Sequence, residues 1–554
     1  MTTLLLPAWT DALLLPAVYR RWLLSRAKHP SLGGHVRMSR RAARWVPHHC
    51  LVGDAFFNAD GASPELVTQR RAGFDRLGTY FRSSSPITLE HTRRLRESLS
   101  DLQLTSRYRV PYPFSEWVRE HLPVGAFMAS SQGMHLRDMD GHPYLDITGS
   151  YGVNVMGLEA YKTWMRQGLE LGEALGPLLG SYHPCVLDNV ERLKRISGMD
   201  EVSFHMSGTE AVMQAVRLAR YHTGKQHVVR FTGAYNGWWD DVQPGPGNPA
   251  SVHETYTLRD MHQATLNVLR SRHDIACVIV NPLQGLHPNK GAPGDSTLVD
   301  GSRSAGFDRE AYGQWLKQLR AVCTERGIAL IMDEIFVGFR VHREGAQAYF
   351  GVQADLVCYG KTLAGGYPVG VVCGRSAWMR RFKPEQPGNL CFARGTFNSH
   401  PYVMGAMNAF LHYLDTPEAH ALYEGVEERW NRERAAFNQA FENADVPVRI
   451  QNLSSIWTVT YTQPGRYHWM YQFYCRQQGL YMSWVGSGRM MFSLDASDGD
   501  VRQVRDRMVA AAKAMQADGW WDLPSGTTLK TLRRRVVREM LAAKWPKLLG
   551  WWRP

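Results

Sequence analysis

Short apolar runs alternate with longer segments of helical periodicity through the middle of the chain. The runs are Val228–Phe231, Ile275–Val280, Ile328–Met332 and Leu356–Tyr359. Strands that alternate with helices favour a mostly parallel sheet, because parallel strands need crossover connections and the crossover helices then cover both faces. We therefore predict an α/β fold whose large domain is a three-layer α/β/α sandwich.

The periodicity changes after about residue 425. The run Ser455–Tyr461 alternates like a strand, and apolar residues before and after it recur at helical spacing. These apolar residues are Trp430, Phe437 and Phe441 on one side, and Val501, Val504, Met508 and Met515 on the other. The pattern predicts a second, smaller α+β domain.

Composition excludes several classes of protein. Of the 554 residues, 44% are hydrophobic and 21% are charged, which is typical of a packed globular chain and not of disorder or a coiled-coil rod. The eight cysteines include no CxxC pair. We therefore expect neither a disulfide scaffold nor a metal site, and we expect a reducing, cytoplasmic compartment.

The positive charge of the chain lies at its two ends. The net charge is +13, and residues 1–48 and 530–554 each contribute about +7. The body between them is close to neutral. A basic groove across the body is therefore not predicted, and we expect no nucleic-acid partner.

Both ends combine basic and apolar residues. Pro7, Asp11 and Pro16 interrupt the N-terminal leucines, which disfavours a spanning helix, and the arginines follow the apolar run rather than precede it as in a signal peptide. The C-terminal end predicts an amphipathic helix that stops at Pro546, with Trp545, Trp551 and Trp552 nearby. Such ends suit contact with a membrane surface, and packing on the body or on a second subunit is the alternative.

Three segments carry residues suited to chemistry. Ser207, Gly208 and Thr209 stand between a strand-like run and a helix, where free N–H groups and the helix dipole suit a phosphate. Asp333 and Lys361 each follow an apolar run, and the carboxyl ends of parallel strands line the ligand crevice. A lysine beside an acid is a candidate for Schiff-base chemistry. Solvated acids and an ordinary N-cap are the alternatives.

Six motifs occur in a characteristic order: SGTEA, GAYNGWWD, NPLQG, DEIFVGFR, YGKTLAGGYPVG and RGTFNSHP. In this order they resemble the class III aminotransferases, which are fold-type I enzymes that use pyridoxal 5'-phosphate (PLP). The glutamate-1-semialdehyde aminomutase-like branch is the most similar. The resemblance spans roughly residues 113–520.

The resemblance implies five segments. They are an N-terminal extension of unknown role (1–112), the first part of the small domain and a substrate wall (113–165), the PLP-binding large domain (166–425), the C-terminal small domain (426–525) and a basic amphipathic tail (526–554).

The resemblance also implies roles for individual residues. Lys361 matches the catalytic lysine that forms the internal aldimine with PLP, and Asp333 matches the carboxylate that pairs with the pyridine nitrogen. The remaining matches are to cofactor-binding residues. They are Ser207, Gly208 and Thr209 around the phosphate, Tyr235 stacked on the ring, Gln284 near the ring hydroxyl, and Thr396, which such enzymes donate to the phosphate of the neighbouring subunit. The last match implies a homodimer with shared sites.

The sequence departs from the family pattern at two positions. Relatives usually carry histidine where this chain has Asn236, and often carry glutamate where it has Asn281. Asparagine does not titrate near neutral pH as histidine does. Neither change alters Lys361 or Asp333.

Three further residues are candidates for substrate binding. Arg489 falls roughly where other class III aminotransferases carry an arginine for a carboxylate, a role that suits a guanidinium group. Ser150 and Tyr151 match the segment that walls the substrate side in relatives. A surface arginine is the alternative for Arg489.

The resemblance implies a PLP-dependent aminotransferase that moves an amino group from an amino-acid donor to a ketone or aldehyde, with a lipid-like or carrier-bound acceptor if the ends contact a membrane. Three alternatives remain open: an intramolecular aminomutase, another PLP reaction at Cα, and a non-catalytic scaffold.

Overall fold

A computed structural model describes residues 8–250, 253–286, 305–483 and 488–546. The described chain divides into two compact units. Unit 1 comprises the described residues within 1–44, 164–292 and 307–416, and unit 2 comprises those within 45–163, 293–306 and 417–554. The long N-terminal extension is therefore shared between the two units.

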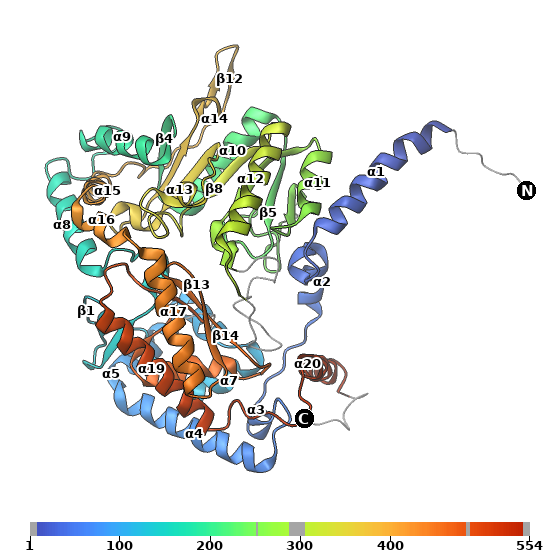
Figure 1. Cartoon of the computed structure of the whole chain (residues 1–554), viewed down its shortest axis with the longest axis vertical. Helices are drawn as coiled ribbons and strands as arrows, with labels where there is room; N and C mark the ends of the chain where they lie inside the picture. Colours follow the sequence, from blue (N-terminus) through green and yellow to red (C-terminus); the bar gives the residue numbers. More distant parts are fainter. Residues whose placement is uncertain (1–7, 251–252, 287–304, 484–487, 547–554) are drawn as a thin grey trace, which may run out of the picture. The chain divides into compact units, whose positions relative to one another are not determined.

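A seven-stranded sheet forms the centre of unit 1 (Figure 1). The inner strands pair in parallel, and β10 runs antiparallel to both of its neighbours, β4 and β9. The prediction of a mostly parallel α/β sheet is confirmed. In spatial order the strands are β4 (Glu201–His205), β10 (Gly370–Gly374), β9 (Leu356–Gly360), β8 (Ala329–Asp333), β7 (Ile275–Val280), β5 (His227–Phe231) and β6 (Thr255–Leu258).

Strands β7, β8 and β9 are fully buried along their whole length, which explains why their sequences are continuous apolar runs rather than alternating ones. Helix α10 (Gly208–Thr223) packs across several of these strands, and its alanine and valine side chains join the core. The other helices of unit 1 are α9 (Cys185–Ser197), α11 (Gln263–Ser271), α12 (Arg309–Arg326), α13 (Gly345–Phe350), α14 (Ser376–Met379) and α15 (Pro401–Tyr413), and α8 (Leu158–Gly172) joins the units; β11 (Phe382–Lys383) and β12 (Gln386–Leu390) form a hairpin.

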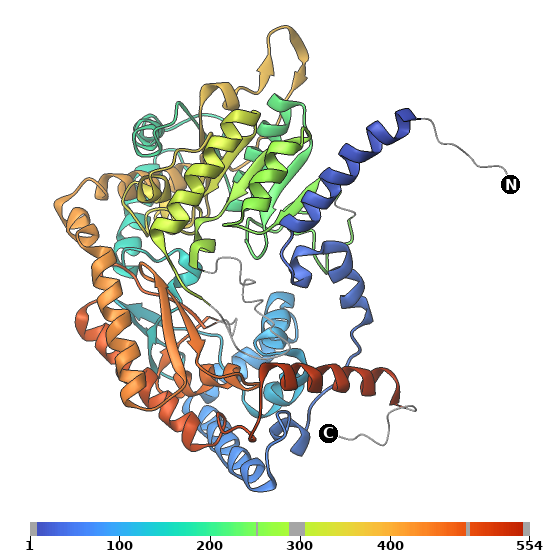
Figure 2. The same cartoon turned by 45° about the vertical axis from the view of Figure 1, so that its right-hand side comes forward.

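The first part of the N-terminal extension is attached to unit 1. Helix α1 (Ala8–Ala27) packs against α11 near its C-terminal end, and the rest of α1 extends beyond α11 (Figure 2). The backbone N–H of Arg259 donates to the carbonyl of Ala27, and Arg40 in α2 (Val36–Trp45) donates to the carbonyl of Ala250. These bonds fix residues 27–40 beside the outer strand β6.

Unit 2 contains two small sheets and several helices. One sheet has the order β1 (Ser130–Gln132), β2 (His135–Arg137), β3 (Pro143–Asp146), β15 (Leu480–Tyr481), and the other has the order β13 (Val448–Leu453), β14 (Ile456–Tyr461), β16 (Arg489–Met491). The helices are α3 (Asp54–Phe57), α4 (Pro64–Ser84), α5 (Pro86–Arg96), α6 (Ser100–Tyr108), α7 (Tyr112–His121), α16 (Pro417–Tyr423), α17 (Val426–Asn443), α18 (Tyr471–Gln477) and α19 (Asp498–Ala517).

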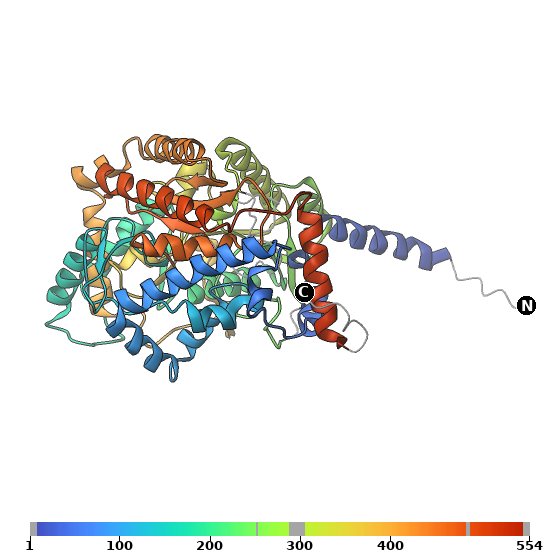
Figure 3. The ribbon, with the colours of Figure 1, turned by 90° about the horizontal axis from the view of Figure 1, so that it is seen from below.

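The C-terminal helix α20 (Leu529–Lys544) is the deep red helix of Figure 3. Its apolar stripe is covered within unit 2, since Leu532 and Val536 are almost fully buried. Buried Glu539 on the same face forms an ion pair with Arg466, also buried. This stripe therefore packs on the body. Trp551 and Trp552 lie outside the described residues.

None of the described helices combines the length and the hydropathy that a bilayer-spanning segment requires.

Candidate active site

Asp333 and Lys361 lie at the carboxyl ends of neighbouring parallel strands in unit 1. Asp333 is the last residue of β8 and is in register with Cys358 of β9, and Lys361 directly follows β9. The two side chains are close enough for each to influence the charge of the other. The structure thus brings together the two residues that the sequence placed at strand ends.

The carboxylate of Asp333 is buried but hydrogen-bonded. It is 2% exposed, and it accepts bonds from Asn236 Nδ2 at 2.7 Å and from the backbone N–H of Ile335 at 3.2 Å. Burial raises its pKa to about 6, and the two hydrogen bonds and the charge of Lys361 oppose that rise. Near neutral pH the carboxylate is therefore negatively charged. It accepts only two hydrogen bonds from the described residues, so it can also bind a positively charged group.

The amine of Lys361 is shielded from water. Burial, aided by the charge of Arg340, lowers its pKa, and Asp333 opposes this. A lowered pKa increases the fraction of neutral amine, the form that attacks a carbonyl carbon. The residue also has a φ of +50°, and its Nζ lies 5.4 Å from the centre of the Phe336 ring. Positive φ in a residue other than glycine is uncommon.

Glu334, the acid that follows Asp333, contacts a different part of unit 1. Glu334 is 1% exposed and accepts from the backbone N–H groups of Ala346 and Gln347 at the start of α13. Burial raises its pKa to about 7. Glu334 therefore caps a helix, and Asp333 alone of the pair faces Lys361.

Both departures from the family pattern have defined contacts. Asn236 is buried and donates to Asp333, and its Oδ1 has no hydrogen-bond partner among the described residues. Asn281 Nδ2 donates to the carbonyl of Tyr235 at 3.0 Å. Asn236 thus holds the carboxylate, and Asn281 holds the backbone of the tyrosine expected to stack on the ring. The sequence alone gave no signal for these contacts.

The N-terminus of α10 has a glycine that allows other groups to come close to its backbone. Ser207 is its N-cap and accepts from the N–H of Glu210. A Cβ on Gly208 would lie 2.7 Å from the side chain of Ile335, so only glycine fits there. The first N–H groups of a helix have no partner within it and favour an anion. The N–H of Thr209 is one of these groups. Gly237 approaches the same residue closely, since a Cβ on Gly237 would lie 2.8 Å from Thr209 Oγ1.

Three further predicted residues lie in unit 1. The side chain of Tyr235 is 60% exposed. Gln284 Nε2 donates to the carbonyl of Thr232 at 3.2 Å, and its buried Oε1 has no partner among the described residues. Thr396 is exposed in a loop beside the exposed Phe397.

The substrate candidates Ser150, Tyr151 and Arg489 all lie in unit 2. Ser150 and Tyr151 have φ of +47° and +57°, and Arg489 begins strand β16. The structure also places Arg109 near Tyr151, with its pKa lowered to about 10 by burial and by the charge of Arg476. Sequence analysis missed Arg109, because its neighbours are distant in the chain.

The residues of unit 1 fit the cofactor that the sequence resemblance implies. An anion suited to a pyridinium nitrogen, an amine suited to an aldehyde and a helix N-terminus suited to a phosphate lie in one unit. The unpartnered Oδ1 of Asn236 and Oε1 of Gln284 are further polar atoms that a ligand could satisfy.

Comparisons with known proteins agree with the interpretation that the residues of unit 1 bind this cofactor. A family model described as aminotransferase class-III matches residues 117–512. Among solved structures, a transaminase with PLP bound shares 24% identity over 78% of this chain and 99% of its own, with a TM-score of 0.62. A β-phenylalanine aminotransferase from Variovorax paradoxus shares 24% over 82% and 98%, with a TM-score of 0.65. A glutamate-1-semialdehyde aminomutase from Pseudomonas aeruginosa PAO1 shares 18% over 81% and 99%, also at 0.65.

Proposed function

The chain belongs to the class III aminotransferases and is a PLP-dependent enzyme, and from this premise we propose that it transfers an amino group from an amino-acid donor to a ketone or aldehyde through Lys361. The observation that carries the proposal is the pairing of buried Asp333 with the low-pKa amine of Lys361 at adjacent strand ends. Ionisable groups with shifted pKa values cluster at functional sites, so this pair favours catalysis over a non-catalytic scaffold.

PLP, when bound, supplies the electron sink that stabilises a carbanion at the substrate Cα. Lys361 would hold the cofactor through Nζ. A neutral Nζ beside the substrate would also be able to accept the proton from Cα and return it elsewhere, and the lowered pKa of Lys361 favours that neutral form.

Asp333 would keep the ring nitrogen protonated, because a buried carboxylate with few partners gains most from a cationic one. Asn236 fixes the orientation of that carboxylate, and the N-terminus of α10 would hold the phosphate. Tyr235, held by Asn281, presents an exposed ring that can cover the cofactor face.

Titration of the purified holoenzyme with amino donors tests the proposal. We expect glutamate or alanine to bleach the visible absorbance band of the lysine-bound cofactor and to release one keto acid per site. Addition of a suitable carbonyl acceptor should restore the band. The spectrum and the keto acid are measured together in a single turnover.

The alternative is intramolecular amino transfer, as named for the aminomutase neighbour. In that case the cofactor-bound enzyme would convert its substrate without a separate donor, and no keto acid would accumulate. A donor-independent reaction would therefore exclude our proposal in favour of this one.

We also propose a homodimer in which Thr396 reaches the phosphate of the partner's cofactor. Large apolar side chains are exposed on unit 1, which suits burial against a second copy. They are Tyr235, Trp238, Phe392 and Phe397, with exposed fractions from 52% to 74%.

The N-terminal extension supports a further proposal, which is peripheral contact with an acidic membrane surface. A cavity of about 570 Å³ between this extension and β6 is lined by Arg21, Lys28, Arg37 and Arg41. Among the described residues, no carboxylate forms an ion pair with any of the four. Tyr19 and Trp22 are exposed beside them on α1, as suits a lipid interface.

We also propose a cytoplasmic location. All eight cysteines are free, which suits a reducing compartment.

Replacing Arg21, Arg37 and Arg41 by glutamine should weaken binding to anionic vesicles by tenfold or more, since each basic residue near such a surface contributes about 1 kcal/mol. Co-flotation with phosphatidylserine vesicles measures this. The matched control replaces Arg94, Arg432 and Arg502, which are exposed on unit 2. Equal loss in both triple variants, or no flotation of the wild type, would contradict the proposal.

A further inference from the structure

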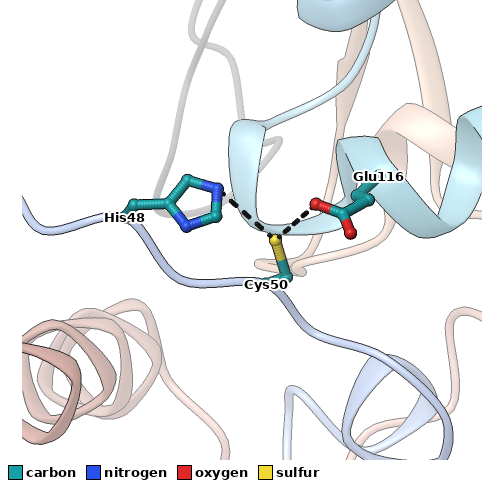
Figure 4. Close-up of side chains that lie close together, drawn as sticks. All are labelled: His48, Cys50 and Glu116. Atoms are coloured by element: carbon teal, nitrogen blue, oxygen red, sulfur yellow. Dashed lines mark hydrogen bonds between the residues drawn. The ribbon is translucent and has the colours of Figure 1, made fainter.

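Three potential metal ligands converge in unit 2, whereas the candidate cofactor residues belong to unit 1. Figure 4 shows the side chains of His48 and Cys50 directed toward Glu116 of α7. One nitrogen, one sulfur and one oxygen atom of these three residues all lie within 4.8 Å of one another. None of these three residues belongs to the six motifs that carry the resemblance to aminotransferases.

The backbone holds the three side chains in place before any ion binds. The hydroxyl of Tyr112 donates to the carbonyl of Pro47, and the N–H of Leu51 donates to the carbonyl of Pro113. These bonds fix the chain on both sides of Cys50 against the first turn of α7. The ring of His49 points to Tyr112 instead, with Nδ1 3.0 Å from its hydroxyl.

The residues of this loop divide between two contacts on α7. His48 and Cys50 lie beside Glu116, whereas the ring of His49 contacts Tyr112. On α7, Glu116 lies four residues after Tyr112 and hence on the same face of the helix. The loop-to-helix contact therefore places all three ligand atoms together.

The distances and the charge suit a zinc ion. Cys50 Sγ lies 3.2 Å from Glu116 Oε2 and 3.7 Å from His48 Nε2. Ligands of a tetrahedral zinc ion are separated by about 3.5 Å, given bonds of about 2.3 Å to sulfur and about 2.0 Å to nitrogen or oxygen. A thiolate and a carboxylate would balance the charge of Zn²⁺, and the thiolate disfavours Mg²⁺ and Ca²⁺.

We propose that His48, Cys50 and Glu116 bind a zinc ion that fastens the loop at 47–51 to α7. Binding forms a Zn–S bond, and the thiol proton leaves to solvent. His48 and Glu116 are exposed, so a water molecule can take the fourth position. Arg107 and Arg119 also lie near the thiol and oppose a cation, so we expect weaker binding than in a closed four-ligand site.

Competition with a chromophoric zinc chelator tests the site in the full-length holoenzyme. We expect the wild type to take up one zinc ion per chain. Cys50→Ser should weaken binding about 100-fold or more, and Glu116→Gln and His48→Gln should each weaken it about tenfold or more. The matched control is Glu120→Gln, an exposed carboxylate one turn further along α7, which should bind like the wild type.

Thermal unfolding gives a second readout. Zinc at a concentration that saturates the wild-type site but not the weakened site should raise the midpoint of the wild type and of Glu120→Gln, because a ligand that binds only the folded state stabilises it. The same concentration should raise the midpoint of Cys50→Ser much less. Zinc uptake by Cys50→Ser equal to that of the wild type, or no uptake by the wild type, would overturn the proposal.

Discussion

The Lys361→Ala variant is expected to lose amino transfer by about 10⁴-fold or more and to lack the visible band of the lysine-bound cofactor. In the proposed function the Nζ of Lys361 would both hold the cofactor and move the proton at Cα. Acid–base assistance alone contributes about 10²–10⁴-fold. Single-turnover absorbance and keto acid release measure both losses. Lys317→Ala, an exposed lysine on α12, is the matched control and should behave like the wild type.

A small added amine separates the two roles of Lys361. If the side chain moves a proton, methylamine should restore part of the rate to the alanine variant without restoring the covalent link. Full activity in the alanine variant, with the wild-type spectrum, would contradict the assignment of Lys361.

The same variant tests the shared site. Thr396→Asp should weaken activity by repelling the phosphate, and mixing its subunits with Lys361→Ala subunits should restore activity. In a mixed dimer, one site receives an intact Lys361 from one chain and an intact Thr396 from the other. Failure of the mixture to regain activity, with mixed dimers shown to form, would exclude an exchange of Thr396 between subunits.

The second large effect is expected at Asp333, where function and stability oppose each other. Asp333→Asn should reduce amino transfer on the order of 100-fold or more, because the amide no longer stabilises a protonated ring nitrogen. The same change should stabilise the cofactor-free protein at pH 8. Asn236 can accommodate it, since its unpartnered Oδ1 can turn to accept from the new amide.

The pKa of Asp333 sets the pH range of this stabilisation. Its folded-state pKa is raised from 3.8 to about 6, so its contribution to stability is present below its ordinary pKa and is lost as the pH rises through about 6. The shift corresponds to at most about 3 kcal/mol above that range. The charge of Asp333 also contributes to the raised pKa of Glu334, which is about 7. Removal of that charge relieves repulsion between the two carboxylates at pH 8, so it acts in the same direction as the effect at Asp333.

Unfolding midpoints of the cofactor-free wild type and Asp333→Asn at pH 4.5 and pH 8 measure this difference. We expect the variant to unfold at a higher temperature than the wild type at pH 8 and by a smaller margin at pH 4.5, because at pH 4.5 the folded-state carboxyl is already protonated. A variant that is less stable at pH 8 would show that Asp333 is needed for folding rather than held for the cofactor.

The sheet and the two central catalytic candidates could be predicted from local sequence. Continuous apolar runs form strands buried on both faces, and the residue that follows such a strand lies at the edge of the sheet that binds ligands. Asp333 is the last residue of β8 and Lys361 directly follows β9, so their meeting required only that these two strands be neighbours. The class of cofactor followed from the order of the motifs.

The contacts around these residues could not be read from the sequence. The Asp-Glu pair gave two equivalent acids, and only the fold shows that Glu334 caps α13 while Asp333 faces Lys361. Asn236 was noticed only as a departure, and its bond to Asp333 joins residues 97 apart in the chain. Such pairs depend on how strands and loops are placed, which no local pattern encodes.

The ends of the chain show the same division. The sequence determined that α20 is an amphipathic helix, because the spacing of its apolar residues is local. Only the tertiary structure decided what that stripe contacts, with Leu532 and Val536 buried in unit 2, and it alone brought His48 and Cys50 to Glu116. Periodicity along the chain fixes which face of an element is apolar, whereas the partner of that face depends on segments distant in sequence.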